Sequence, residues 1–142
     1  MGVTTPDSPP HYAQYESWIT AGLHGEMTYL ETDRARECRA DPRQILPECE
    51  TILVLGVRYP APAGGDSNTP DRATSPLGHI ASYAWGDDYH LTLPPRLKSL
   101  VQFIEKNVGH PIPNRWYTDT GPILERDLAQ RAGLGWIAKI RV

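Results

Sequence analysis

TILVLGVRY, residues 51–59, is an uninterrupted run of β-branched and aliphatic side chains that ends at Pro60. Runs of this kind are typical of a strand that is buried on both faces of a sheet. The chain then continues through residues 60–78, which are mostly Pro, Gly, Ser, Asn and Asp, and this composition predicts a flexible surface loop. We therefore expect one core strand followed by a long loop.

The residues before this strand predict helices. Apolar side chains recur at helical spacing over residues 10–22, which predicts an amphipathic helix. A second helical segment is expected over residues 26–36. Asp41 followed by Pro42 combines an N-cap residue with a proline in the first turn, so a short helix should run from there through Leu46.

The residues after the loop alternate irregularly between strand and helix. Pro94 and Pro95 predict the start of a helix that Gly109 ends, because proline is tolerated in a first turn but breaks a helix interior. The other elements expected here are a strand at 79–85, a strand at 115–118 and a helix at 122–132. The fold class that follows is α+β: a single, incomplete layered domain over residues 1–142, with a small mixed sheet and flanking helices.

Composition and charge exclude several classes of protein. The 142 residues are 39% hydrophobic and 22% charged, as in an ordinary globular domain. No stretch approaches the roughly 18 to 20 apolar residues of a membrane span, and the N-terminus lacks the features of a signal peptide, so we expect a cytoplasmic protein. Cys38 and Cys49 are expected to be free thiols. Neither belongs to a C-x-x-C motif, so this chain alone predicts no zinc or iron–sulfur site.

The net charge of -3 gives no general attraction to phosphate. A local basic surface has one candidate, a run of four arginines in one segment. This run could contact nucleic acid, or it could be a solvated helix face. Its members are Arg34, Arg36, Arg39 and Arg43.

The segment DTGPILER, residues 119–126, is the strongest candidate for chemistry. Asp119 stands at a predicted strand end, next to a tight turn and directly before a helix, and ligands often bind at such junctions in layered folds. It could simply cap or precede the helix. It could also donate or accept a proton, with a pKa that burial would raise and the helix dipole would lower. The sequence leaves both interpretations open.

A second candidate is YAWGDDYH, residues 83–90. Its aromatic side chains could line a flat, conjugated ligand, or they could belong to the core beside a hydrogen-bonded histidine. Asp87, Asp88 and His90 superficially resemble metal ligands. A turn explains Gly-Asp-Asp adequately, and no second ligand cluster accompanies them, so we predict no metal site.

Five motifs occur together in the order and approximate spacing of one family. They are GEMTYL (25–30), RADPR (39–43) followed by LP (46–47), YAWGDDYH (83–90), DTGPILER (119–126) and RAGLGW (131–136). This ordered set resembles the epoxyqueuosine reductases over about residues 2–139, and residues 1–4 look like the tail of the family's first strand. A reductive dehalogenase, a distant corrinoid enzyme, is a less suitable match because the YAWG and DTGP segments occur as a pair.

The resemblance implies an oxidoreductase of queuosine biosynthesis. Such an enzyme removes the epoxide oxygen of epoxyqueuosine at the wobble position of tRNA, using cobalamin that two iron–sulfur clusters reduce. The resemblance places the proton donor at Asp119, and an acid that is protonated near neutral pH should be substantially buried. It places the cofactor contacts at Arg39, Ala81, Tyr83, Trp85, Asp119 and Lys139.

Departures from the family pattern limit what this chain should do alone. Ser82 stands where the family usually has arginine, and Pro94 and Pro95 interrupt a helix that is normally continuous, which could displace Tyr89 and His90. The cysteine-rich and helical-repeat segments of the family have no counterpart in the sequence. We therefore expect an N-terminal region that needs an external reductant and is not active by itself. The full-length family members are expected to be monomers. The alternative is a non-catalytic or decayed corrinoid-binding fragment.

Overall fold

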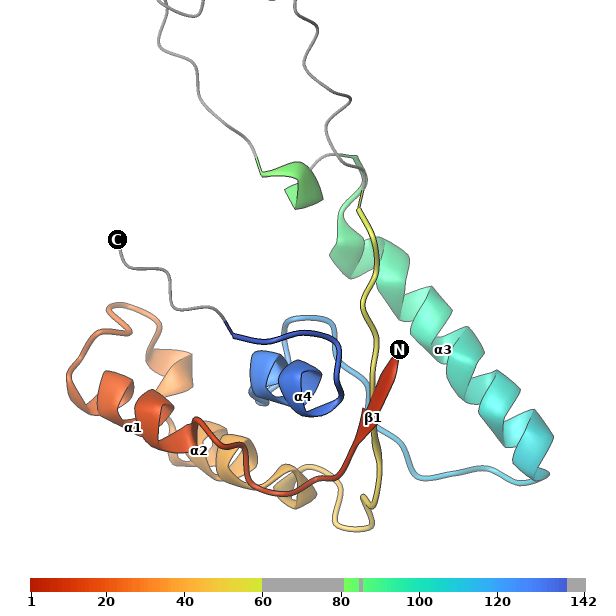
Figure 1. The fold of residues 1–142 in the computed structure, drawn as a ribbon, viewed down its shortest axis with the longest axis horizontal. Helices are drawn as coiled ribbons and strands as arrows, with labels where there is room; N and C mark the ends of the chain where they lie inside the picture. The colour runs from red at the N-terminus through yellow and green to blue at the C-terminus, as the bar shows by residue number, and fades with distance from the viewer. Residues whose placement is uncertain (60–80, 85, 138–142) are drawn as a thin grey trace, which may run out of the picture.

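A computed structural model of the chain describes residues 1–59, 81–84 and 86–137. The described residues form an α+β fold that is mostly helical (Figure 1), which confirms the predicted fold class. The expected loop at 60–78, Trp85 and Lys139 lie outside the described residues. The elements are β1 (Gly2–Thr4), α1 (Tyr12–Thr20), α2 (Asp33–Ala40), β2 (Ile52–Val54), α3 (Tyr89–Val108) and α4 (Glu125–Arg131), with short 3-10 helices η1 (Thr28–Leu30), η2 (Pro42–Gln44) and η3 (Ser82–Ala84).

The sheet is smaller than expected. Strand β1 pairs with β2 in antiparallel register, with Val3 opposite Leu53, so the prediction of a mixed sheet was wrong for the described residues. The predicted strand at 51–59 is hydrogen-bonded only over 52–54. Leu53 is 40% exposed and Val57 is 53% exposed, so this run is not buried on both faces. It has one strand partner in the described part of the chain, and apolar composition alone cannot bury a strand that lacks covering elements.

The buried side chains of the core come mainly from α1, α2 and α4. Tyr15 and Ile19 of α1 pack with buried residues of α2, while Leu128 of α4 is 2% exposed. Figure 1 shows α4 between the α1–α2 pair and β1. Helix α3 lies on the other side of the extended segment that contains β2. The approach of α4 to β1 requires Gly2, because a Cβ at that position would come within 2.1 Å of the Ala132 carbonyl oxygen.

The N-terminal helix predictions were largely confirmed. Helix α1 lies inside the predicted 10–22 segment, and the Asp41 carboxylate caps η2 by accepting a hydrogen bond from the Arg43 amide at 3.0 Å. The predicted 26–36 helix was wrong in extent, since η1 and α2 are separate. The break falls at Thr32, whose hydroxyl accepts a hydrogen bond from the Ala35 amide and so begins a new helix.

The second half of the chain departs further from prediction. Residues 82–84 form η3, so the predicted strand at 79–85 was wrong there, and residues 115–118 form no strand. Neither segment has a sheet edge beside it in the described structure, and an isolated strand has no hydrogen-bond partners. Helix α4 starts three residues later than predicted. It ends as predicted at Gly133, which has a φ of 73°.

Helix α3 begins at Tyr89, so the prediction that Pro94 and Pro95 start it was wrong. The Asp88 carboxylate caps the helix by accepting a hydrogen bond from the His90 amide at 2.8 Å. Because Pro94 and Pro95 have no N–H, the carbonyls of His90 and Leu91 lack a helical hydrogen-bond donor. Both residues are exposed, so water can donate these hydrogen bonds instead. None of the described helices combines the length and apolar composition that a membrane span requires.

The two thiols differ sharply in exposure. Cys38 is 1% exposed inside the core, whereas Cys49 is half-buried, and both are free. Because a thiol reagent needs access to the sulfur, we expect one equivalent to react rapidly in the native chain and two in denaturant. A colorimetric thiol assay with Cys49→Ser as the control variant checks this. Equal, rapid reaction of both thiols in the native chain would show that the α1–α2 core is not formed.

Candidate functional site

Asp119 connects the start of α3 with the loop that leads into α4. Its carboxylate Oδ2 accepts a hydrogen bond from the Tyr89 hydroxyl at 2.9 Å, and its amide donates to Glu125 Oε1 at 3.1 Å. Its φ is 60°, which makes it the only non-glycine residue with positive φ in the described part of the chain. The side chain of Asp119 is therefore held by Tyr89, 30 residues earlier in the sequence. Its backbone amide is held by Glu125, 6 residues later.

The turn after Asp119 is tightly built. Asp119 does not cap α4, since the N-cap is Leu124 and makes no side-chain capping bond. Gly121 lies against the ring of Tyr117, and a Cβ at residue 121 would come within 2.4 Å of Tyr117 Cγ. The hydroxyl of Thr118 is buried without a hydrogen-bond partner among the described residues. The Asp-Thr-Gly segment is thus shaped by the Gly121–Tyr117 contact and by the hydrogen bonds of Asp119, and not by helix capping.

An aromatic cluster of Tyr83, Tyr89 and His90 adjoins this carboxylate. The rings of Tyr83 and Tyr89 meet edge to face at 6.3 Å, and Tyr89 and His90 lie 4.0 Å apart at an angle of 31°. Tyr83 is 56% exposed, so these side chains are not core aromatics. His90 pairs with Asp88 at 2.9 Å. The cluster presents open ring surface beside a carboxylate, which suits a flat ligand.

Hydrogen bonds and burial change the pKa of three groups here. The bond to the Asp119 carboxylate raises the pKa of Tyr89. Burial raises the pKa of Glu125, although the hydrogen bond from the Asp119 amide lowers it in part. The backbone amide of His90, and then its ring, lower the pKa of Asp88. The neighbouring carboxyls thus differ in environment, as in sites that handle protons.

The burial expected of Asp119 is not found, because the residue is exposed. Its two hydrogen-bond partners come from the start of α3 and the start of α4, and only the first of them, Tyr89, bonds the carboxylate. The prediction of a sheltered acid was therefore wrong for the described structure. The carboxylate is positioned, but water reaches it.

The other predicted cofactor contacts are dispersed. Arg39 is 8% exposed and stacks over the Tyr15 ring at 5.4 Å, while its guanidinium donates to the Ala35 carbonyl. No hydrogen bond or ring contact in the described structure connects it with Asp119 or the aromatic cluster. Ala81 is exposed next to η3. The structure therefore brings together only part of the predicted set.

The arginines of this run form contacts within the molecule. Arg36 pairs with Glu16 at 3.2 Å, and Arg43 donates to the Pro6 carbonyl at 3.0 Å. Arg34 donates to the Gln44 carbonyl at 2.6 Å. These contacts join α1, α2, η2 and the N-terminal segment. The run is neither a simple solvated face nor a free basic patch.

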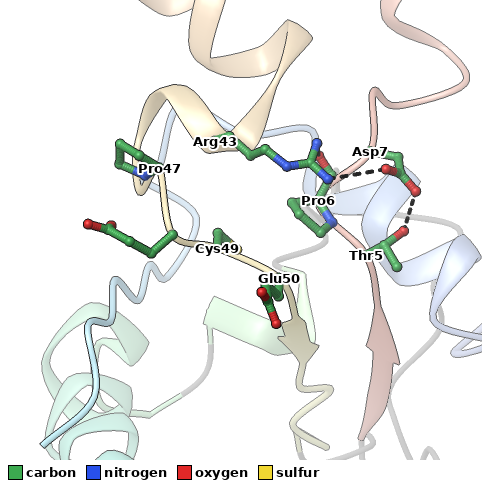
Figure 2. A pocket seen from close by; sticks show the side chains of 8 residues that line it. Thr5, Pro6, Asp7, Arg43, Pro47, Cys49 and Glu50 are labelled. Carbon is green, nitrogen blue, oxygen red and sulfur yellow. Dashed lines mark hydrogen bonds and ion pairs between the residues drawn. The ribbon is translucent and has the colours of Figure 1, made fainter.

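An open pocket of about 580 Å³ that the sequence did not predict lies beside the N-terminal segment (Figure 2). Arg43 points across it toward Asp7, and the Thr5 hydroxyl also donates to the Asp7 carboxylate. Cys49 lies in the opposite wall. Because Thr5, Asp7 and Arg43 already pair with one another, these three groups offer a ligand little unsatisfied hydrogen bonding. No group of three metal-ligating side chains occurs within residues 1–59, 81–84 and 86–137.

Comparison with known proteins gives a consistent result. The sequence model of the family "Epoxyqueuosine reductase QueG, DUF1730" matches residues 39–120, more than half of the chain. The epoxyqueuosine reductase of Synechocystis sp. is 36% identical over 87% of this chain and 39% of its own length. Those of Pseudomonas aeruginosa and Escherichia coli are 33% and 34% identical over 98% of this chain, and over 37% and 35% of their own lengths.

The chain thus spans little more than a third of the length of the curated relatives it matches. No solved structure matches it. The family match contains Arg39, the aromatic cluster and Asp119, so the residues gathered by the structure belong to the matched region. The chain belongs to the epoxyqueuosine reductase family.

Proposed function

We propose that this chain is the N-terminal, cofactor-facing region of an epoxyqueuosine reductase, and that Asp119 is its proton donor. The reaction takes epoxyqueuosine to queuosine at the wobble position of tRNA: two electrons and two protons convert the epoxide into an alkene and water. The observation that carries the proposal is the Asp119 carboxylate held by Tyr89 beside exposed aromatic rings. Family membership supports the choice of reaction.

Part of the site fits cobalamin. Ala81 and Tyr83 are exposed, and Tyr83 belongs to the aromatic cluster, so they offer backbone and ring surface to a flat macrocycle. The Thr118 hydroxyl makes no hydrogen bond within the described residues. Arg39 does not fit, because it is committed to Tyr15 and Ala35. When bound, reduced cobalamin supplies the electrons for opening the strained ring. Trp85 and Lys139 remain part of the proposal as residues outside the described structure.

The chain's own contribution is the handling of one proton. Asp119 would carry it on the carboxyl group that Tyr89 orients, and would give it to the oxygen that leaves carbon. A carboxyl group with this role must be protonated, which requires shelter from water in the loaded enzyme. We propose that bound cofactor and substrate supply this shelter, because Asp119 is exposed in the described structure.

The remaining partners belong to the whole enzyme. We propose two iron–sulfur clusters as the electron source, held by residues other than those described here, and an external reductant that loads them. The substrate is tRNA carrying epoxyqueuosine, which places the protein in the cytoplasm. The full-length protein is proposed to act as a monomer.

A conversion assay tests the proposal. A full-length reductase whose N-terminal region carries this sequence is incubated with epoxyqueuosine tRNA, cobalamin and a chemical reductant, and the nucleosides are analysed by mass spectrometry. We expect queuosine from the full-length protein and none from residues 1–142 alone. A full-length protein that binds cobalamin yet forms no queuosine would instead support a non-catalytic, corrinoid-binding role.

A further inference from the structure

The backbone of Asp119 adopts a conformation that its own side chain does not favour. A φ of 60° places it in the left-handed region, which L-residues with a Cβ rarely occupy. Asparagine and aspartate are the most tolerant of the non-glycine residues there, but the conformation still costs free energy. Some contact in the folded chain must therefore hold residue 119 in place.

Glu125 supplies that contact. Its Oε1 accepts the hydrogen bond of the Asp119 amide at 3.1 Å, across six residues of loop. The Glu125 side chain is half-buried, whereas Asp119 and the hydrogen bond itself are exposed. A charged acceptor also makes a stronger bond than a neutral one.

The helix that carries Glu125 is itself anchored. The Asp127 carboxylate accepts hydrogen bonds from the His11 amide at 3.0 Å and from His11 Nδ1 at 2.7 Å. Arg131 donates to the Asp7 carbonyl at 2.7 Å, and Leu128 is buried. Helix α4 is thus attached to the N-terminal segment at two separate points, which makes its first residue a fixed support for the loop.

We infer that Glu125 is a positioning residue for Asp119: it holds the amide of residue 119 so that the carboxylate is presented to Tyr89 and to the open face of the site. It acts through Asp119 and does not itself contact substrate. The inference deepens the proposed function and rests on it only in taking Asp119 as the acid. The hydrogen bond itself can be tested independently of any reaction.

The acidity of Glu125 separates this role from a general stabilising one. Burial raises its pKa in the folded chain, and the hydrogen bond from the Asp119 amide opposes part of that rise. The folded state therefore binds more protons than the unfolded state between the two pKa values, so stability falls as pH rises through that window. The charged side chain thus costs stability at neutral pH. Accordingly, Glu125→Gln should leave the melting temperature at pH 7 unchanged or slightly higher.

A pH titration of amide proton shifts in residues 1–142 tests the contact. The Asp119 amide should show an upper midpoint, above the ordinary glutamate range, that reports Glu125. Asp119→Asn should keep this upper midpoint, whereas Glu125→Gln should remove it. The wild-type titration needs no variant, and an Asp119 amide without an upper midpoint overturns the inference.

Glu105 provides a matched control. Its Oε1 accepts a hydrogen bond from the Ile112 amide at 3.1 Å, the same kind of carboxylate-to-amide bond in a different loop. Glu105→Gln should change the titration of the Ile112 amide and leave that of Asp119 unchanged. If Glu105→Gln abolishes the upper midpoint of Asp119, that midpoint does not report Glu125, and the inference fails.

Turnover in the full-length reductase gives the functional readout. Glu125→Ala removes the acceptor of the Asp119 amide and should lower kcat about tenfold with little change in KM, because misplacing an acid affects the reacting step more than binding. Unchanged kcat in Glu125→Ala, where Asp119→Asn is inactive, overturns the positioning role and leaves the proposed function standing. Activity retained by Asp119→Asn overturns the proposed function instead, and the amide titration still decides whether the contact exists.

Discussion

Asp119→Asn in a full-length reductase carrying this sequence should lose roughly 10²- to 10⁴-fold in turnover, the usual contribution of a positioned general acid. Asparagine is close to aspartate in shape and tolerates positive φ, so the loop and its bond to Glu125 should persist. It cannot release a proton to a leaving oxygen. The measurement is the rate of queuosine formation with cobalamin and reductant in excess, together with an absorbance titration showing that cobalamin still binds.

Asp87→Asn is the matched control. Asp87 is an exposed carboxylate in the turn between η3 and α3, within the same sequence motif as the aromatic cluster. It should keep turnover within about twofold of wild type, since surface substitutions of this kind rarely matter. Equal losses in both variants, or unchanged turnover in Asp119→Asn, would remove Asp119 from the acid role.

Leu128→Ala should have the largest effect on stability. Leu128 is 2% exposed and is one of the few buried apolar side chains in the described residues. Truncating a buried leucine costs about 2–5 kcal/mol. Single domains are stable by only about 5–15 kcal/mol, and a core this small belongs near the lower limit. We therefore expect most of the secondary structure to be lost at 37 °C, as followed by circular dichroism during thermal and urea unfolding.

Leu91→Ala makes the same chemical change on the surface. Leu91 lies in α3 and is 74% exposed, so its truncation should alter the free energy of unfolding by less than about 0.5 kcal/mol. Similar unfolding midpoints for the two variants would mean that α4 is not packed as described. The support of Asp119 by Glu125 would then lose its foundation.

Local chemistry was what the sequence predicted best. The cap at Asp41, the stop at Gly133 and the position of α1 all follow from residues within a few positions of one another, and the structure confirms them. The strand at 51–59 was predicted too long and too buried, because burial depends on what lies on each face. No local pattern carries that information.

The candidate site was predicted in the same uneven way. The Asp-Thr-Gly motif pointed to Asp119, which contacts Tyr89 in the structure. The Tyr-Ala-Trp-Gly motif pointed to Tyr83, which lies in the adjoining aromatic cluster. The partnership with Glu125 was missed, although a glutamate six residues after a turn aspartate was a visible signal. Arg39 was predicted to face a ligand but packs on Tyr15, a contact that depends on how two helices cross.

The pH dependence of a single turnover tests the acid role of Asp119 most directly. With cobalamin reduced beforehand, the rate of epoxide opening should be constant at low pH and should fall roughly tenfold per pH unit once the proton-donating acid ionises. In Asp119→Asn the rate should be low and independent of pH. A wild-type rate that does not change with pH, or a variant that keeps the wild-type profile, would contradict the account.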